Sequence, residues 1–132
     1  MSIQYRFVKT ITDIQPLLSS LNEHSIIAID TETTGLDPFQ NRIRLIQIAF
    51  INQPVFLIDL WKVSDDIISS LKKIFTSPAL KIFHNAKFDL KFLIKSGFKI
   101  HGPYFDTILA AQILSAGQKS QGFKLSDWCE RN

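Results

Sequence analysis

The sequence predicts an α/β domain with a mixed central sheet flanked by helices. Short apolar runs rich in β-branched residues alternate with stripes of helical periodicity, which indicates strands interleaved with amphipathic helices. A loop of four residues joins the runs 43–50 and 55–58, which favours an antiparallel hairpin. A chain of 132 residues with 45% hydrophobic content is long enough for one domain with a real core.

The elements follow one another in a regular order. We expect strands at 5–8, 26–29, 43–50, 55–58, 80–83 and 104–105. The three opening strands form an antiparallel meander, and the later strands alternate with helices and pair in parallel. Helices are expected at 14–21, 67–75, 86–95, 107–114 and 125–131, with Thr10 or Thr12, Ser64 and Asp106 as capping residues.

Composition and charge limit the location and the kind of substrate that we expect for this chain. No apolar stretch is long enough to span a membrane, and the one cysteine, Cys129, forms no intramolecular disulfide, which fits a cytoplasmic location. The net charge is +3, but residues 1–61 carry −2 and residues 62–132 carry +5. A basic half beside a carboxylate site suits a polyanionic substrate, although an ordinary solvated surface has the same composition.

Two carboxylates stand at the end of the buried strand at 26–29. Strand side chains alternate between faces, so Asp30 and Glu32 project from the same face. Ionised carboxylates side by side repel each other, and a hard cation such as Mg²⁺ or Mn²⁺ removes that repulsion. The alternative is a capping carboxylate beside a solvated one, but the apolar run before the pair and the Thr-Thr-Gly turn after it favour the metal site.

A third carboxylate, Asp89, lies on the helix at 86–95. It falls at the edge of the apolar arc formed by Leu90, Leu93 and neighbouring residues, roughly opposite a stripe of lysines. A carboxylate turned toward a core needs a partner, although an aspartate in a first turn also favours the helix dipole. Three carboxylates from two elements predict a site for two metal ions.

Two further polar features carry weaker signals. Lys87, Lys91 and Lys95 form one helical stripe, which suits either a phosphate backbone or a solvated face. Gln47 interrupts an apolar strand, and we expect it to hydrogen-bond a buried group in a structural role.

Four segments in this order resemble a known group. Residues 27–38 (IAIDTETTGLDP) and 84–93 (HNAKFDLKFL) are similar to the first two motifs of the DEDD superfamily of 3′–5′ exonucleases. Residues 105–114 (FDTILAAQIL) and 125–129 (LSDWC) resemble segments of ribonuclease D, Werner-type exonucleases and the proofreading domains of family A DNA polymerases. The resemblance implies a ribonuclease H-like fold over nearly the whole chain.

The resemblance also implies residue roles. Asp30, Glu32 and Asp89 would bind two divalent ions, Mg²⁺ or Mn²⁺, and so form the catalytic centre. Thr33 would lie near the terminal 3′ hydroxyl, Leu36 would pack against the terminal bases, and Asn85 would hold the substrate strand. Asp106 is not a primary ligand in that family and is interpreted as a helix cap.

One family motif is not found. The third motif is a Tyr or His followed by an Asp, on a helix beyond the segment at 125–129, and residues up to Asn132 contain no such pair. His101 and Tyr104 are in the wrong place to replace it. We therefore expect a single exonuclease-like domain over 1–132 that is truncated before the third motif and incomplete at the C-terminus, whose exposed apolar faces favour self-association or a second polypeptide.

Two functions are compatible with these sequence features. The first is metal-dependent 3′–5′ exonuclease activity on single-stranded DNA or RNA 3′ ends, releasing nucleoside 5′-monophosphates and weak or absent in this chain alone. The second is a catalytically silent nucleic-acid-binding or assembly module on the same fold. A ribonuclease H-like nuclease of another branch is disfavoured by the spacing of Asn85 and Asp89 and by the segment beginning at Phe105.

Overall fold

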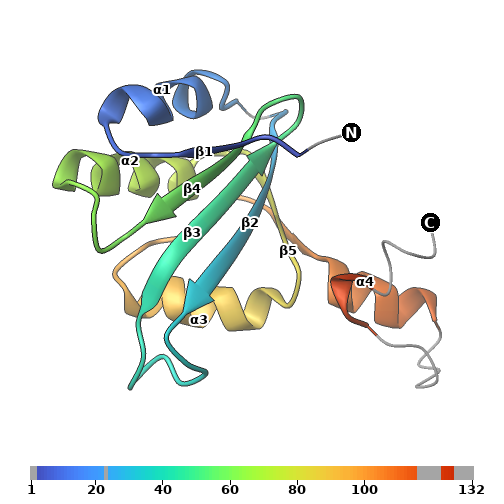
Figure 1. The fold of residues 1–132 in the computed structure, drawn as a ribbon. Helices are drawn as coiled ribbons and strands as arrows, with labels where there is room; N and C mark the ends of the chain where they lie inside the picture. The colour runs from blue at the N-terminus through green and yellow to red at the C-terminus, as the bar shows by residue number, and fades with distance from the viewer. Residues whose placement is uncertain (1–2, 23, 116–122, 127–132) are drawn as a thin grey trace.

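A computed structural model describes residues 3–22, 24–115 and 123–126. In this part of the chain, strands in the order β1-β4-β3-β2-β5-β6 form one mixed sheet with helices packed against it (Figure 1). The strands are β1 (Tyr5–Phe7), β2 (Ile26–Thr33), β3 (Ile43–Phe50), β4 (Val55–Asp59), β5 (Leu80–Phe83) and β6 (Tyr104–Asp106). The helices are α1 (Ile11–Ser19), α2 (Asp65–Thr76), α3 (Ala86–Lys95) and α4 (Thr107–Leu114). The predicted helix at 125–131 lies largely outside the described residues.

The sheet confirms the predicted α/β class and the mixed strand directions. Strands β2, β3 and β4 form the antiparallel meander, β5 pairs with β2 in parallel, and β6 pairs with β5 in parallel. The position of β1 differs from the expectation, because β1 pairs in parallel with β4 at the edge instead of opening the meander. Helix α1 separates β1 from β2 and packs on α2, so the two strands need not be neighbours.

One face of the sheet carries the core. Ile27, Ile29 and Thr31 of β2 alternate inward, and their partners Ile46 and Ile48 on β3 face the same way. Apolar residues of α1, α2 and α3 pack on this face in a single cluster that includes the following residues: Ile14, Leu17, Ile67, Leu71, Ile74, Phe75, Phe92 and Leu93. The period-two alternation of β2 therefore places alternate side chains on a covered and an uncovered face.

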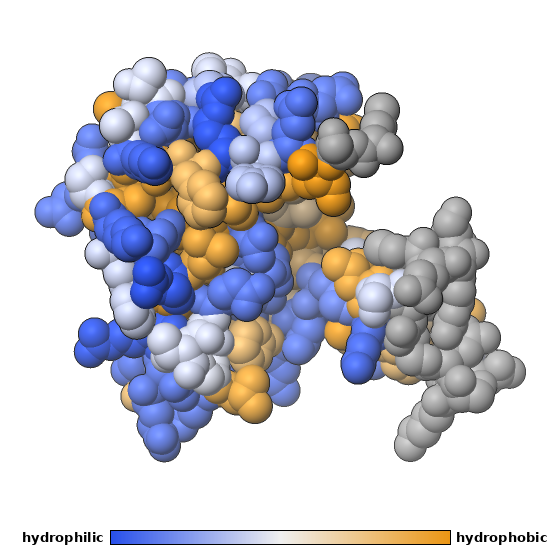
Figure 2. Space-filling model, in the orientation of Figure 1, coloured by the Kyte–Doolittle hydropathy of each residue, from blue (hydrophilic) through white to orange (hydrophobic). Residues whose placement is uncertain are grey.

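The opposite face of the sheet is open among the described residues. Ile26, Ala28, Asp30 and Glu32 all project from this face of β2, and all are exposed. Figure 2 shows apolar and polar residues interleaved on the side of the molecule that faces the viewer, while α1, α2 and α3 lie behind the sheet in the same orientation (Figure 1). No described helix is long and apolar enough to cross a bilayer.

Candidate metal and nucleic-acid site

The first predicted feature, the pair of carboxylates on β2, is present. Asp30 lies opposite Gln47 of β3 in the antiparallel ladder, and Glu32 lies opposite Leu45. The side-chain amide of Gln47 donates to Asp30 Oδ2 at 3.0 Å and more weakly to Glu32 Oε1 at 3.4 Å. One amide thus holds both carboxylates on the open face of the sheet.

The third carboxylate, Asp89, lies on the covered side of β2. Its side chain is 2% exposed, and its Oδ1 accepts from the backbone N–H of Thr31 at 3.0 Å and from the Thr31 hydroxyl at 2.7 Å. Burial, together with the nearby charge of Asp30, raises the pKa of Asp89 to about 6 against the lowering effect of the Thr31 bonds. The prediction that a core-facing Asp89 needs a partner is confirmed, and the partner is Thr31.

The three carboxylates approach β2 from its two sides, and the described side chains do not form a finished metal centre. Asp30 and Glu32 face one way and the intervening Thr31 faces the other, where it binds Asp89. Among the side chains that the structure describes, no group of three His, Cys, Asp or Glu residues is arranged to hold an ion. The donor chemistry fits Mg²⁺ or Mn²⁺, because carboxylate oxygens are the ligands that hard cations prefer.

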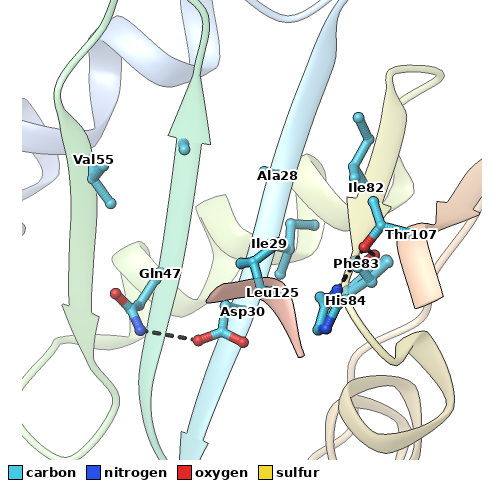
Figure 3. A pocket seen from close by; sticks show the side chains of 11 residues that line it. Ala28, Ile29, Asp30, Gln47, Val55, Ile82, Phe83, His84, Thr107 and Leu125 are labelled. Atoms are coloured by element: carbon cyan, nitrogen blue, oxygen red, sulfur yellow. Dashed lines mark hydrogen bonds between the residues drawn. The ribbon is translucent and has the colours of Figure 1, made fainter. Parts of the chain in front are cut away.

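A cavity of about 450 Å³ lies on the open face next to Asp30 (Figure 3). Ala28, Gln47, His84 and Leu125 are among the residues that line it. Partial burial here raises the pKa of Asp30, while bonds from the Thr31 backbone and Gln47 and the charge of His84 lower it. A carboxylate with a raised pKa and few compensating cations is a site that a bound cation would stabilise.

The ring of His84 is fixed beside this cavity. Its Nδ1 lies 2.8 Å from the hydroxyl of Thr107, and that hydroxyl donates to the carbonyl of Phe83 at 3.1 Å. Because the hydroxyl proton is used by Phe83, His84 Nδ1 is the donor to Thr107.

The predicted substrate residues fall into two groups. Leu36 and Asn85 line one hollow together with Lys87 and Phe88, so the structure brings these two residues together. Thr33 lies at the end of β2, where its hydroxyl donates to the carbonyl of Gly35 at 2.6 Å and so shapes the turn that presents Leu36. Strand β2 therefore carries the carboxylate pair, and the turn that follows its end carries Leu36.

Asn85 adopts an unusual backbone conformation between β5 and α3. Its φ is 73° and its ψ is 56°, a left-handed conformation that asparagine tolerates better than most residues. The carboxylate of Asp106 accepts from the backbone N–H of Asn85 at 3.1 Å and of Ala86 at 2.8 Å. A third bond, from the N–H of Ile108 at 2.9 Å, confirms that Asp106 caps α4.

Three residues do more in the structure than the sequence predicts. Gln47 bonds the two exposed carboxylates and not the predicted buried group, and its place opposite Asp30 in the hairpin register is the signal for this contact. Thr31 holds Asp89, because strand alternation turns it toward the core. Asp106 caps α4 as predicted and also holds the start of α3, which only the parallel pairing of β5 and β6 reveals.

Comparisons with known proteins identify the family of this chain. A family model described as 3′–5′ exonuclease matches residues 5–132. DNA polymerase I of Borreliella burgdorferi is 32% identical over 124 residues, which cover 89% of this chain and 14% of the polymerase. Ribonuclease D of Bartonella henselae is 30% identical over 145 residues, which cover 96% of this chain and 34% of that enzyme. The chain thus spans only a minor part of the length of these relatives.

Solved structures share the fold. Escherichia coli RNase D superposes with a TM-score of 0.77 at 24% identity, over 98% of this chain and 33% of RNase D. The catalytic core of RRP6 from Trypanosoma brucei gives a TM-score of 0.75 at 29% identity, over 98% of this chain and 35% of that core. NrnC of Brucella melitensis bound to pGG gives 0.76 at 24% identity, over 98% of this chain and 61% of NrnC. With the family model matched from residue 5 to residue 132, the chain belongs to the 3′–5′ exonuclease family.

Proposed function

We propose that this chain is the catalytic part of a metal-dependent 3′–5′ exonuclease that removes nucleoside 5′-monophosphates from single-stranded nucleic acid. The observation that carries the proposal is the carboxylate pair of Asp30 and Glu32, held by one amide at the end of β2. The match to the 3′–5′ exonuclease family model over residues 5–132 supports it. Similar proteins support the substrate class, because NrnC has been solved with pGG and Trypanosoma brucei RNase D with RNA U12.

Two divalent ions, Mg²⁺ or Mn²⁺, would be held by Asp30, Glu32 and Asp89. When bound, such ions lower the pKa of a water molecule and stabilise a leaving oxygen. NrnC has been solved with Mg²⁺, which is the ion that these oxygen donors suit.

The chain's own residues position the reacting end. Gln47 fixes the Asp30 carboxylate, and Thr31, the next residue of β2, fixes Asp89. Leu36 and Asn85 share a hollow in which the apolar side chain packs on a terminal base and the amide binds the strand. A terminal phosphodiester between the hollow and the carboxylates would then face Asp30.

The experiment is degradation of matched single-stranded DNA and RNA, labelled at the 3′ end, with Mn²⁺. Wild type should release labelled mononucleotide at a low rate, as expected for this chain alone, and Asp30→Asn should abolish release because it removes a charged ligand without changing shape. Asp65→Asn, which makes the same change at an exposed carboxylate on α2, should behave like wild type. Equal release by wild type and Asp30→Asn would refute the proposed site.

A catalytically silent nucleic-acid-binding or assembly module is the second candidate. It is favoured by the absence, among the described side chains, of three carboxylates arranged around an ion. Retained binding of a labelled oligonucleotide, with no release from wild type in either metal, would select this function.

The proposal includes association through the open face of the sheet. Ile26 is 48% exposed there, and Ala28, Ala49, Val55 and Ile82 line the adjoining cavity. Covering these side chains with a second copy or another polypeptide would remove apolar surface from water. Sedimentation should show self-association or a monomer of low stability, whereas a stable monomer that unfolds cooperatively would count against it.

A further inference from the structure

The loop between β2 and β3 presents two apolar side chains to solvent. Leu36 is 85% exposed and Phe39 is 80% exposed. The loop is braced from within, because Asp37 accepts from the N–H of Phe39 at 2.9 Å through Oδ1 and from the N–H of Asn41 at 2.8 Å through its carbonyl. Exposure of Phe39 is therefore a property of an ordered loop, and a large exposed apolar side chain on such a loop suggests a partner.

Cations of α3 lie beside these side chains. Leu36, Phe39, Lys91, Ile94 and Lys95 line one hollow, and Ile94 is itself 63% exposed. The ammonium of Lys95 stands 5.0 Å from the centre of the Phe39 ring. The lysine stripe noted in the sequence is thus not an isolated solvated face, because it adjoins an exposed aromatic ring.

A second aromatic side chain continues the same surface. Trp61 is 57% exposed, and it shares the next hollow with Phe39, Arg42 and Lys95. The guanidinium of Arg44 lies 4.3 Å from the centre of the Trp61 ring. The structure therefore presents two exposed rings, each with a cation over one face.

The acidic groups of this surface are already engaged. Asp59 accepts from the guanidinium of Arg44 at 2.8 Å, and Asp37 Oδ1 accepts from the Phe39 amide. Three cations, Arg42, Lys91 and Lys95, line the two hollows beside them. The surface is consequently basic as well as aromatic.

We propose that this aromatic strip, defined as Leu36, Phe39, Trp61, Arg42, Lys91 and Lys95, binds the single-stranded nucleic acid upstream of its 3′-terminal nucleotide. Bases stack on the two rings, and the lysines and Arg42 pair with phosphates, which is the combination that proteins use for single strands. The inference deepens the proposed function, since Leu36 also lines the hollow of Asn85 at one end of the strip.

The test measures binding apart from hydrolysis. The whole chain carrying Asp30→Asn is titrated in Mg²⁺ with fluorescein-labelled dT12 and dT3, and anisotropy is followed over a range of salt concentrations. Phe39→Leu with Trp61→Leu keeps apolar bulk at two exposed positions and removes the rings. Lys91→Gln with Lys95→Gln removes two charges, and Lys72→Gln with Lys73→Gln, on α2, is the matched control.

The strip predicts three results. Each of Phe39→Leu and Trp61→Leu, measured singly, should weaken dT12 binding roughly 5- to 100-fold, and the double variant should weaken it more. All three should leave dT3 binding within about twofold, because dT3 reaches only the terminal hollow. Loss of Lys91 and Lys95 should reduce the slope of log affinity against log salt by about 1.4, whereas the α2 control should leave it unchanged. Undetectable dT12 binding, equal losses in the α2 control or unchanged affinity without the rings would each overturn the proposal.

Two further arms separate this inference from the proposed function. Polyglutamate should compete with dT12 much less well than unlabelled dT12, and equal competition would indicate a general polyanion surface and overturn the stacking argument. Release of mononucleotide from dT3 by the chain with native Asp30 tests the exonuclease alone. Release without the expected dT12 pattern refutes the strip only, and the dT12 pattern without release refutes the exonuclease only.

Discussion

Asp89→Asn should stabilise the metal-free protein at neutral pH, and the gain should disappear in acid. Burial raises the pKa of Asp89 from its ordinary value of 3.8 to about 6, so the fold prefers the neutral carboxyl. Asparagine is neutral at every pH and keeps an oxygen that accepts from the N–H and the hydroxyl of Thr31. The variant therefore removes a buried charge without removing its hydrogen bonds.

The magnitude follows from the pKa. Below pH 3.8 both the folded and the unfolded chain hold the Asp89 proton, and the carboxyl carries no penalty. Between 3.8 and about 6 the unfolded chain ionises first, so wild-type stability falls as pH rises, and above about 6 the loss is complete. Each pKa unit corresponds to about 1.4 kcal/mol, so the difference between the two proteins should grow from about 0.5 kcal/mol at pH 4 to about 3 kcal/mol at pH 7.

The assay is urea unfolding followed by circular dichroism, in EDTA, at several pH values from 4 to 8. Ionisable groups that do not interact with Asp89 cancel in the difference, so its pH dependence comes from Asp89 and from Asp30, the carboxylate coupled to it. Asp65→Asn is the control, because Asp65 is exposed in the first turn of α2 and its change should be small at every pH. A wild-type-minus-variant difference that stays constant between pH 4 and 7, or a variant that is less stable at pH 7, would refute the reasoning.

Three other perturbations test the site. Mg²⁺ should raise the melting temperature of wild type above that in EDTA, because a ligand that binds only the folded state stabilises it, and should have no such effect on Asp30→Asn. Gln47→Leu removes the bond that lowers the pKa of Asp30, so the acidic limb of the pH–rate profile should move to higher pH, and an unmoved limb would argue against this coupling. Asp106→Ala leaves three backbone N–H groups without their acceptor, so the free energy of unfolding in urea should fall by roughly 2–3 kcal/mol. Asp106→Asn should lose less, and a change below about 0.5 kcal/mol in Asp106→Ala would show that the cap is dispensable.

Most of the sheet could be predicted from local pattern, because strand and helix periodicities are local properties. Alternation along β2 correctly placed Asp30 and Glu32 on one face, and the short connection between β3 and β4 correctly predicted a hairpin. The place of β1 could not be predicted, because its pairing with β4 joins residues far apart in sequence across helix α1. Nothing in the residues 5–7 specifies which edge of the sheet they join.

The geometry of the site likewise follows partly from local sequence pattern and partly from contacts between segments that are distant in sequence. The side of β2 from which each carboxylate projects follows from strand alternation, but the direction of Asp89 depends on how α3 docks beneath β2. Helical periodicity placed Asp89 at the edge of an apolar arc, and the structure turns it fully into the core, where Thr31 is its partner.

Thr31 holds Asp89 beside the strand that carries Asp30, so the ionisation of these two carboxylates is coupled. Asp30 on the open face raises the pKa of Asp89 on the covered face, so neutralising either carboxylate makes ionisation of the other less costly. A cation at Asp30 and Glu32 would act in this sense and lower the pKa of Asp89, which makes that carboxylate a better ligand in turn. Ion binding at the two sides of β2 should therefore be cooperative, and Asp89→Asn should weaken Mn²⁺ binding at the exposed pair less than Asp30→Asn does.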